Sequence, residues 1–122
     1  MENKLFKVCR FNKKLNSYLP FYIEDEYIYQ SAGLAKHIQK RHPECTPFLS
    51  SIASIINSSD YIGVNPNESN PSFELVKVFN KNILIGIKLD INNNYWYVAT
   101  LHSITNGKLE HGLCNGRLQK IK

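Results

Sequence analysis

The sequence predicts the α+β class, with two helices in the N-terminal half packed on an antiparallel, mainly meander β-sheet. Helical patterns at residues 32–41 and 47–56 come first, and strand patterns separated by short turns follow from residue 61 onward. Loops of about three residues join neighbouring strands as antiparallel hairpins. Helices followed by consecutive strands are typical of this class. Because 122 residues suit one domain, we expect a single domain over residues 1–122.

The N-terminal part is predicted to be a small hairpin or meander. Residues 4–11 alternate and carry strand-forming side chains, and residues 18–23 and 26–29 are expected to be two more short strands. An acidic turn at Glu24-Asp25 separates these two strands.

Capping signals set the bounds of the two helices. Ser31 is placed to cap the first helix, and Pro43 ends it because the residue before a proline avoids helical conformation. Thr46 is placed to cap the second helix, with Pro47 at its first position and residues 57–59 closing it. Each helix carries apolar residues on one side, so both should pack on the sheet.

The C-terminal half is predicted to be a run of paired strands bounded by Asn- and Gly-rich turns. In residues 83–91, isoleucine and leucine at alternate positions face inward. Alternation allows either face of the other strands to be buried, so the sequence does not decide which side of the sheet carries a site. Strands are expected at 61–64, 72–79, 83–91, 95–104 and 118–121, with an irregular stretch or short helix at 108–116.

Charge and cysteine content limit the function classes. The formal net charge of +5 favours a polyanionic partner such as nucleic acid. No apolar run approaches the roughly 20 residues that span a bilayer, and the N-terminus lacks the apolar stretch of a signal peptide, so we expect a cytoplasmic protein with no membrane partner. Three widely spaced cysteines and four scattered histidines predict neither a disulfide framework nor a metal site. We expect no cofactor.

Several side chains suit metal-independent cleavage of RNA, which needs a base, an acid and groups that stabilise the charged phosphate. Each also has an ordinary alternative. His42 can complement a helix C-terminal dipole, His37 can be a boundary residue on its helix, and Glu74 with Lys77 can be an exposed ion pair. His102, His111 and Arg117 can each be an ordinary surface residue.

Six segments, in this order, resemble one family: AGLAKHIQKRHPE, DYIGVNPNE, SFELVKVF, ILIGIKLD, YWYVATLHSI and NGRLQ. The series is similar to the phage-associated nucleases of the BECR superfamily, which are grouped with barnase, EndoU, the tRNase colicins and RelE-like toxins. It covers about Ile28 to Lys120. On this basis we expect a nuclease-like core over residues 28–122, preceded by a strand or hairpin extension over residues 1–27.

The resemblance implies a toxin-like, metal-independent endoribonuclease in which the 2′-hydroxyl attacks the phosphate. The implied partners are RNA, with tRNA as one candidate, and an immunity protein or antitoxin. The alternative is a non-catalytic module of a mobile genetic element that binds RNA or protein. The implied catalytic residues are His37, Glu74, Lys77, Thr100 and Arg117, and the implied substrate-binding residues are Arg41, Ser72, Lys88 and His111.

The chain departs from the family pattern at one place. Family members often carry a basic residue shortly before the GRL segment, where this chain has His111, Gly112 and Leu113. His111 would therefore have to take the role of that residue.

Overall fold

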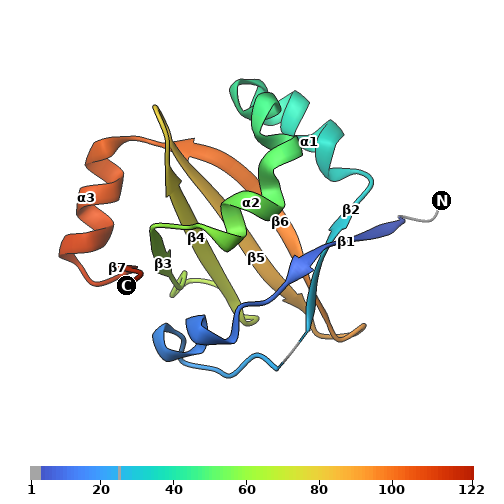
Figure 1. Ribbon diagram of the computed structural model, residues 1–122, viewed down its shortest axis with the longest axis horizontal. Coiled ribbons are helices and arrows are strands. Elements are labelled where there is room, and N and C mark those ends of the chain that lie inside the picture. Colours follow the sequence, from blue (N-terminus) through green and yellow to red (C-terminus); the bar gives the residue numbers. More distant parts are fainter. Residues whose placement is uncertain (1–3, 25) are drawn as a thin grey trace.

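The computed structural model describes residues 4–24 and 26–122, so Asp25 of the expected acidic turn lies outside the described residues. The described residues form one seven-stranded sheet in the order β1-β2-β6-β5-β4-β3-β7 (Figure 1). Neighbouring strands are antiparallel except β2 and β6, which are parallel. The strands are β1 (Leu5–Arg10), β2 (Tyr27–Ser31), β3 (Tyr61–Gly63), β4 (Ser72–Val78), β5 (Asn82–Asp90), β6 (Tyr95–Ile104) and β7 (Leu118–Lys120).

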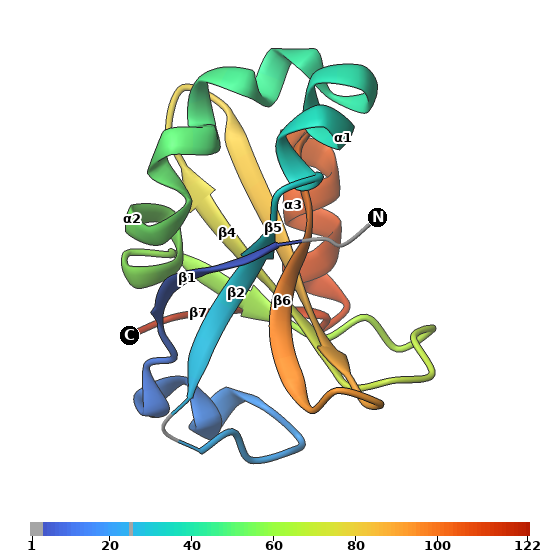
Figure 2. The same cartoon turned by 90° about the vertical axis from the view of Figure 1, so that its right-hand side faces the viewer.

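The expected α+β class is confirmed. Helices α1 and α2, joined by the 3-10 helix η2, cover one face of the sheet, and α3 lies against the other face beside β7 (Figures 1 and 2). No helix among the described residues is long and apolar enough to cross a bilayer. The helices are α1 (Leu34–Arg41), α2 (Ile52–Asn57) and α3 (Asn106–Cys114), with 3-10 helices η1 (Lys13–Tyr18) and η2 (Pro43–Ser51).

The main hydrophobic core lies between the sheet and the layer of α1, η2 and α2. Ile83, Ile85 and Ile87 of β5 point into it and are fully buried, as the alternation predicts. The prediction fails at the end of the strand, where Leu89 is only partly buried and Ile91, just beyond β5, is 55 % exposed. Phe73 and Leu75 of β4 join the three buried isoleucines, and Leu34 and Ile38 of α1 cover them from the helix side. The other face of the central strands is therefore the one that carries polar side chains.

The predicted starts of the two helices are wrong. Ser31 is the last residue of β2, and Gly33 precedes the first residue of α1 without a side-chain cap. Thr46 lies inside η2, which begins at Pro43 and continues through Pro47 before α2 starts. Pro47 inside the segment has no backbone N–H to donate, and the segment has 3-10 geometry in place of the predicted α-helix start.

The strand predicted at residues 18–23 is also wrong. After β1 the chain turns into η1, whose start is fixed by the side-chain oxygen of Asn12, which accepts a bond from the backbone N–H two residues later. The amide of Asn16 then pairs with both backbone groups of Ile23, at 2.9 and 2.8 Å. Those bonds take the place of a partner strand, so the segment needs none.

A β-bulge in β6 decides which side chains face the helices. Gly86 pairs with Thr100, but the next residue of β5, Ile87, pairs with Val98. Ala99 is therefore the extra residue, and the alternation of β6 is broken there. Val98 faces the helices and is 2 % exposed, whereas Thr100 turns to the opposite face.

A small second core holds α3 against that opposite face. Thr105 begins the helix, and its hydroxyl oxygen accepts a bond from the N–H of Lys108 at 3.1 Å. Gly112 lets the helix approach β7, because a Cβ there would lie 2.7 Å from a methyl carbon of Leu118. The stretch at 108–116, which the sequence leaves irregular or helical, is thus mostly helix. The core consists of Val76, Leu84, Leu109 and Leu118.

Candidate functional site

The open face of the sheet carries a floor of polar side chains. Glu74 on β4 lies opposite Gly86 on β5, which in turn lies opposite Thr100 on β6. One step along the strands, Ser72 lies opposite Lys88. Gly86 has no side chain, and the methyl group of Thr100 lies over it, 2.8 Å from where a Cβ would be.

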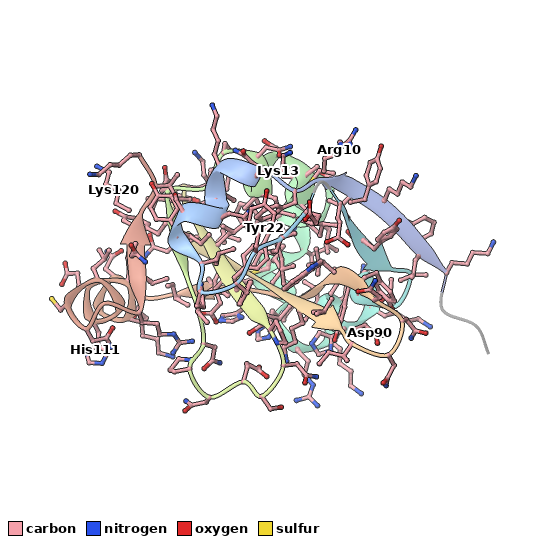
Figure 3. The ribbon with its side chains drawn as sticks, turned by 90° about the horizontal axis from the view of Figure 1, so that it is seen from below. Arg10, Lys13, Tyr22, Asp90, His111 and Lys120 are labelled. Carbon is pink, nitrogen blue, oxygen red and sulfur yellow. The ribbon has the colours of Figure 1, made fainter. Side chains whose placement is uncertain are left out.

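A hollow of about 460 Å³ lies between this floor and α3. In its wall, Nη2 of Arg117 donates to Oε1 of Glu74 at 2.9 Å, and the two side chains are 38 % and 15 % exposed. In Figure 3, His111 of α3 lies in the lower half of the view, as Asp90 does at the other end, whereas Arg10 and Lys13 lie in the upper half. The polar residues that line the hollow are Glu74, His102, Lys108, His111, Asn115 and Arg117.

Local backbone features bring Arg117 to this place. Gly116 has φ at +81°, a conformation that glycine adopts without strain. The side-chain oxygen of Asn115 accepts a bond from the N–H of Arg117 at 2.9 Å. Gly63 of β3 touches the backbone of Arg117 where any Cβ would collide. The arginine is therefore held at the start of β7, facing Glu74.

His102 on β6 is separated from Glu74 on β4 by strand β5, and it is partly buried on the same face of the sheet. Burial lowers the pKa of His102 below its usual value of 6.5, and the nearby His42 lowers it further, while Glu74 acts in the opposite direction. The rings of His102 and His42 are 5.4 Å apart, and those of His42 and His37 are 6.4 Å apart. A row of imidazoles thus leads from α1 to the hollow.

A second hollow of about 250 Å³ adjoins the first and shares Glu74 and His102 with it. Ser72, Lys88 and Thr100 line it. Lys88 pairs with Glu68, from the loop after β3, at 2.9 Å. The hydroxyl of Ser72 is buried and has no hydrogen-bond partner among the described residues.

The structure brings together most of the expected site residues. Of the residues expected to be catalytic, three line the two adjoining hollows: Glu74, Thr100 and Arg117. The expected substrate-binding positions that line them are Ser72, Lys88 and His111.

Three expected site residues lie elsewhere. Lys77 follows the alternation of β4 onto the helix-covered face, where its ammonium lies 3.8 Å from Asp60. His37 and Arg41 are exposed on α1 and line neither hollow. His37 is separated from the floor by His42.

Sequence reasoning considered His102 but left it out of the expected site, and it did not consider Lys108. The signal for His102 was present, because it stands two positions after Thr100 and therefore shares its face of β6. Lys108 could be placed only once α3 was known to flank the sheet. Within the described part of the chain, no group of three or more His, Cys, Asp or Glu side chains could hold a metal ion.

The arrangement combines a carboxylate, an imidazole and a guanidinium around one hollow. A carboxylate can accept a proton, an imidazole can donate or accept one, and a guanidinium binds phosphate oxygens with paired N–H groups. Such a set can hold a phosphate ester and move protons on both sides of it.

Comparison with known proteins bears on this set. The family model described as phage-Barnase-EndoU-ColicinE5/D-RelE like nuclease3 (PBECR3) matches residues 7–111. The match starts before Ile28, where the sequence resemblance was expected to begin, and it ends before Arg117. No curated protein and no solved structure matches the chain. Because the family model covers most of the chain and includes Glu74, Thr100 and His102, the expected resemblance is confirmed, and the protein belongs to this family of phage-associated BECR nucleases.

Proposed function

We propose that the protein is a metal-independent endoribonuclease in which the 2′-hydroxyl of RNA attacks the adjacent phosphate. The observation that supports this proposal is the meeting of Glu74, His102 and Arg117 around one hollow on the open face of the sheet. The reaction needs a proton acceptor, a proton donor and a cation at the phosphate. These three side chains supply one of each.

In the proposed mechanism, the Glu74 carboxylate accepts the proton of the 2′-hydroxyl. The 2′-oxygen forms a bond to phosphorus while the bond from phosphorus to the 5′-oxygen breaks. His102 gives a proton to the departing 5′-oxygen. The products are a 2′,3′-cyclic phosphate and a free 5′-hydroxyl, and Arg117 with Lys108 stabilises the negative charge on the non-bridging oxygens in between.

The lowered pKa of His102 fits a proton donor that is charged only when substrate is present. In the free protein its burial favours the neutral ring. A phosphate bound beside the ring raises the pKa, because a negative charge favours the protonated imidazole. The proton is therefore taken up with the substrate and released to the leaving oxygen.

The second hollow has a binding role in this proposal. The Thr100 hydroxyl donates to a non-bridging oxygen, and Lys88 holds the neighbouring phosphate after exchanging its partner Glu68 for it. The buried hydroxyl of Ser72 gains in the complex the hydrogen-bond partner that it lacks among the described residues.

We extend the proposal to tRNA as the first RNA to test, in the cytoplasm, where tRNA is found. A nuclease acting there would harm the cell that makes it, so an immunity protein or antitoxin is a further proposed partner. Growth arrest on expression, relieved by Glu74→Gln, would support a toxin-like role.

The test is incubation of the purified protein with total tRNA and with a defined oligoribonucleotide in EDTA. We expect discrete fragments ending in a 2′,3′-cyclic phosphate, and no cleavage where the attacking nucleotide lacks its 2′-hydroxyl. Cleavage that requires an added divalent cation, or equal cleavage of DNA, would overturn the mechanism. Tight RNA binding without any cleavage would favour the alternative of a binding module.

A further inference from the structure

A third hollow, of about 480 Å³, adjoins the first hollow at Arg117. The three adjoining hollows are together called the groove. It lies at the edge of the sheet where β3 ends and β7 begins, and Tyr18 at the end of η1 forms one wall. Asn115 and Arg117 line both this hollow and the first one. Since the first hollow also shares residues with the second, the three hollows adjoin one another. The first two lie on the open face, and the third lies round the edge of the sheet, where Tyr18 and Val64 pack against the main core and Gln119 pairs with Ile62 of that core.

The walls of the third hollow differ from those of the other two. Val64 and Pro66 contribute apolar surface, Tyr18 contributes an aromatic ring, and Gln119 contributes an amide. Among the described residues that line it, only Arg117 is charged. This lining offers a phosphate only one cation. It is better matched to a flat, largely apolar group with hydrogen-bond donors and acceptors at its rim.

Tyr18 is held in place at both ends of its side chain. Its ring packs against the main core, and its hydroxyl oxygen accepts a bond from the backbone N–H of Lys122 at 3.0 Å. Figure 1 shows η1 close to the C-terminal end of the chain, in agreement with this contact. A ring fixed in this way loses little freedom when another ring stacks on it.

We propose that the third hollow binds the nucleobase of a nucleotide that flanks the cleaved phosphate, with Tyr18 stacking on the base and Gln119 bonding to its edge. The substrate is then a single-stranded RNA segment that occupies the three hollows in order, one nucleotide in each. Bases in a duplex are stacked on their neighbours and cannot enter separate hollows. This inference rests on the proposed function, because it takes the first hollow as the place of cleavage.

The test uses single-stranded oligonucleotides with one ribonucleotide, so that only one bond can be cut. The shortest substrate is a dinucleotide, with one nucleotide on each side of that bond. Longer substrates add one nucleotide at one end or at the other. We expect the added nucleotide at one end to raise kcat/KM about 5- to 100-fold, which corresponds to stacking of one base. An abasic residue at the same position should lose this gain.

Two variants assign the gain to the third hollow. Tyr18→Leu keeps apolar packing but removes the ring, and Gln119→Ala changes an exposed side chain that the fold does not need. Both should lose most of the gain from the added nucleotide while cutting the shortest substrate within about twofold of the unchanged protein. Tyr18→Phe keeps the ring and is the matched control that should retain the gain. Thermal unfolding checks that each variant is folded.

The outcomes separate this inference from the proposed function. If the shortest substrate is cut but an abasic residue serves as well as a base, or if Tyr18→Leu and Gln119→Ala keep the full gain, the inference is wrong and the nuclease proposal stands. If no substrate is cut, binding of a non-cleavable 2′-O-methyl oligonucleotide is measured instead. A loss of affinity in Tyr18→Leu that Tyr18→Phe does not share would then still support the base site, and equal affinities would overturn it.

Discussion

Replacing Glu74 with Gln separates the chemical role of the central carboxylate from its structural role. Its ion pair with Arg117 joins side chains that are 15 % and 38 % exposed, so solvent screens the pair and its loss should cost about 0.2–1 kcal/mol of unfolding free energy. The Gln side-chain oxygen can still accept from Arg117. Loss of a general base, in contrast, lowers the rate about 100- to 10,000-fold. The expected change in activity is therefore much larger than the change in stability.

The assay is cleavage of the single-ribonucleotide substrate in EDTA, beside urea unfolding of the same variant. Lys77→Gln is the matched control, because it also removes one charge from β4 but on the helix-covered face. This control should cleave within about twofold of the unchanged protein, since its side chain does not face the groove.

Either of two results would refute the reasoning. Cleavage by Glu74→Gln within tenfold of the unchanged protein would show that this carboxylate is not the base. A large loss in Lys77→Gln, with the protein still folded, would place the chemistry on the other face of the sheet.

Three further predictions concern the rest of the groove. With His102 as proton donor, kcat/KM should fall as the pH rises through the pKa of His102, which lies below 6.5, because the ring loses its charge there. A rise in kcat/KM over that range would make His102 a base instead. Ser72→Ala should raise the unfolding free energy by about 1 kcal/mol in urea, since it removes a buried hydroxyl with no partner among the described residues, and should also raise KM. Gly86→Ala should lower the unfolding free energy by about 1 kcal/mol, because its Cβ would lie 2.8 Å from the Thr100 methyl. Adding Thr100→Ser removes that methyl and should recover the lost stability in a double-mutant cycle. If the double variant is as unstable as Gly86→Ala alone, the methyl is not the cause.

The sequence alone determined the fold class and much of the central sheet. The alternating isoleucines of β5 are buried as predicted, and the short turns around that strand pair β4, β5 and β6 as a meander. These features depend on neighbouring residues, so local patterns are enough to specify them. The family resemblance likewise rested on segments that can be read without any structure, and the family match confirms it.

Local patterns were not enough where distant groups supply the hydrogen bonds or the packing. Residues 18–23 read as a strand, but Asn16 satisfies the backbone of Ile23, and no partner strand is needed. The parallel pairing of β2 with β6 joins segments that are widely separated in the chain, and so does the antiparallel pairing of β7 with β3 at the far edge. Such contacts are chosen by the whole fold.

The site itself was decided by tertiary structure. Alternation shows which side chains of a strand share a face, but it does not show which face the helices cover. Packing of α1, η2 and α2 settled that question, placing Glu74 in the groove and Lys77 on the other side. One extra residue, Ala99, then turned Thr100 and His102 toward Glu74, because a bulge reverses the faces of all that follows it in the strand.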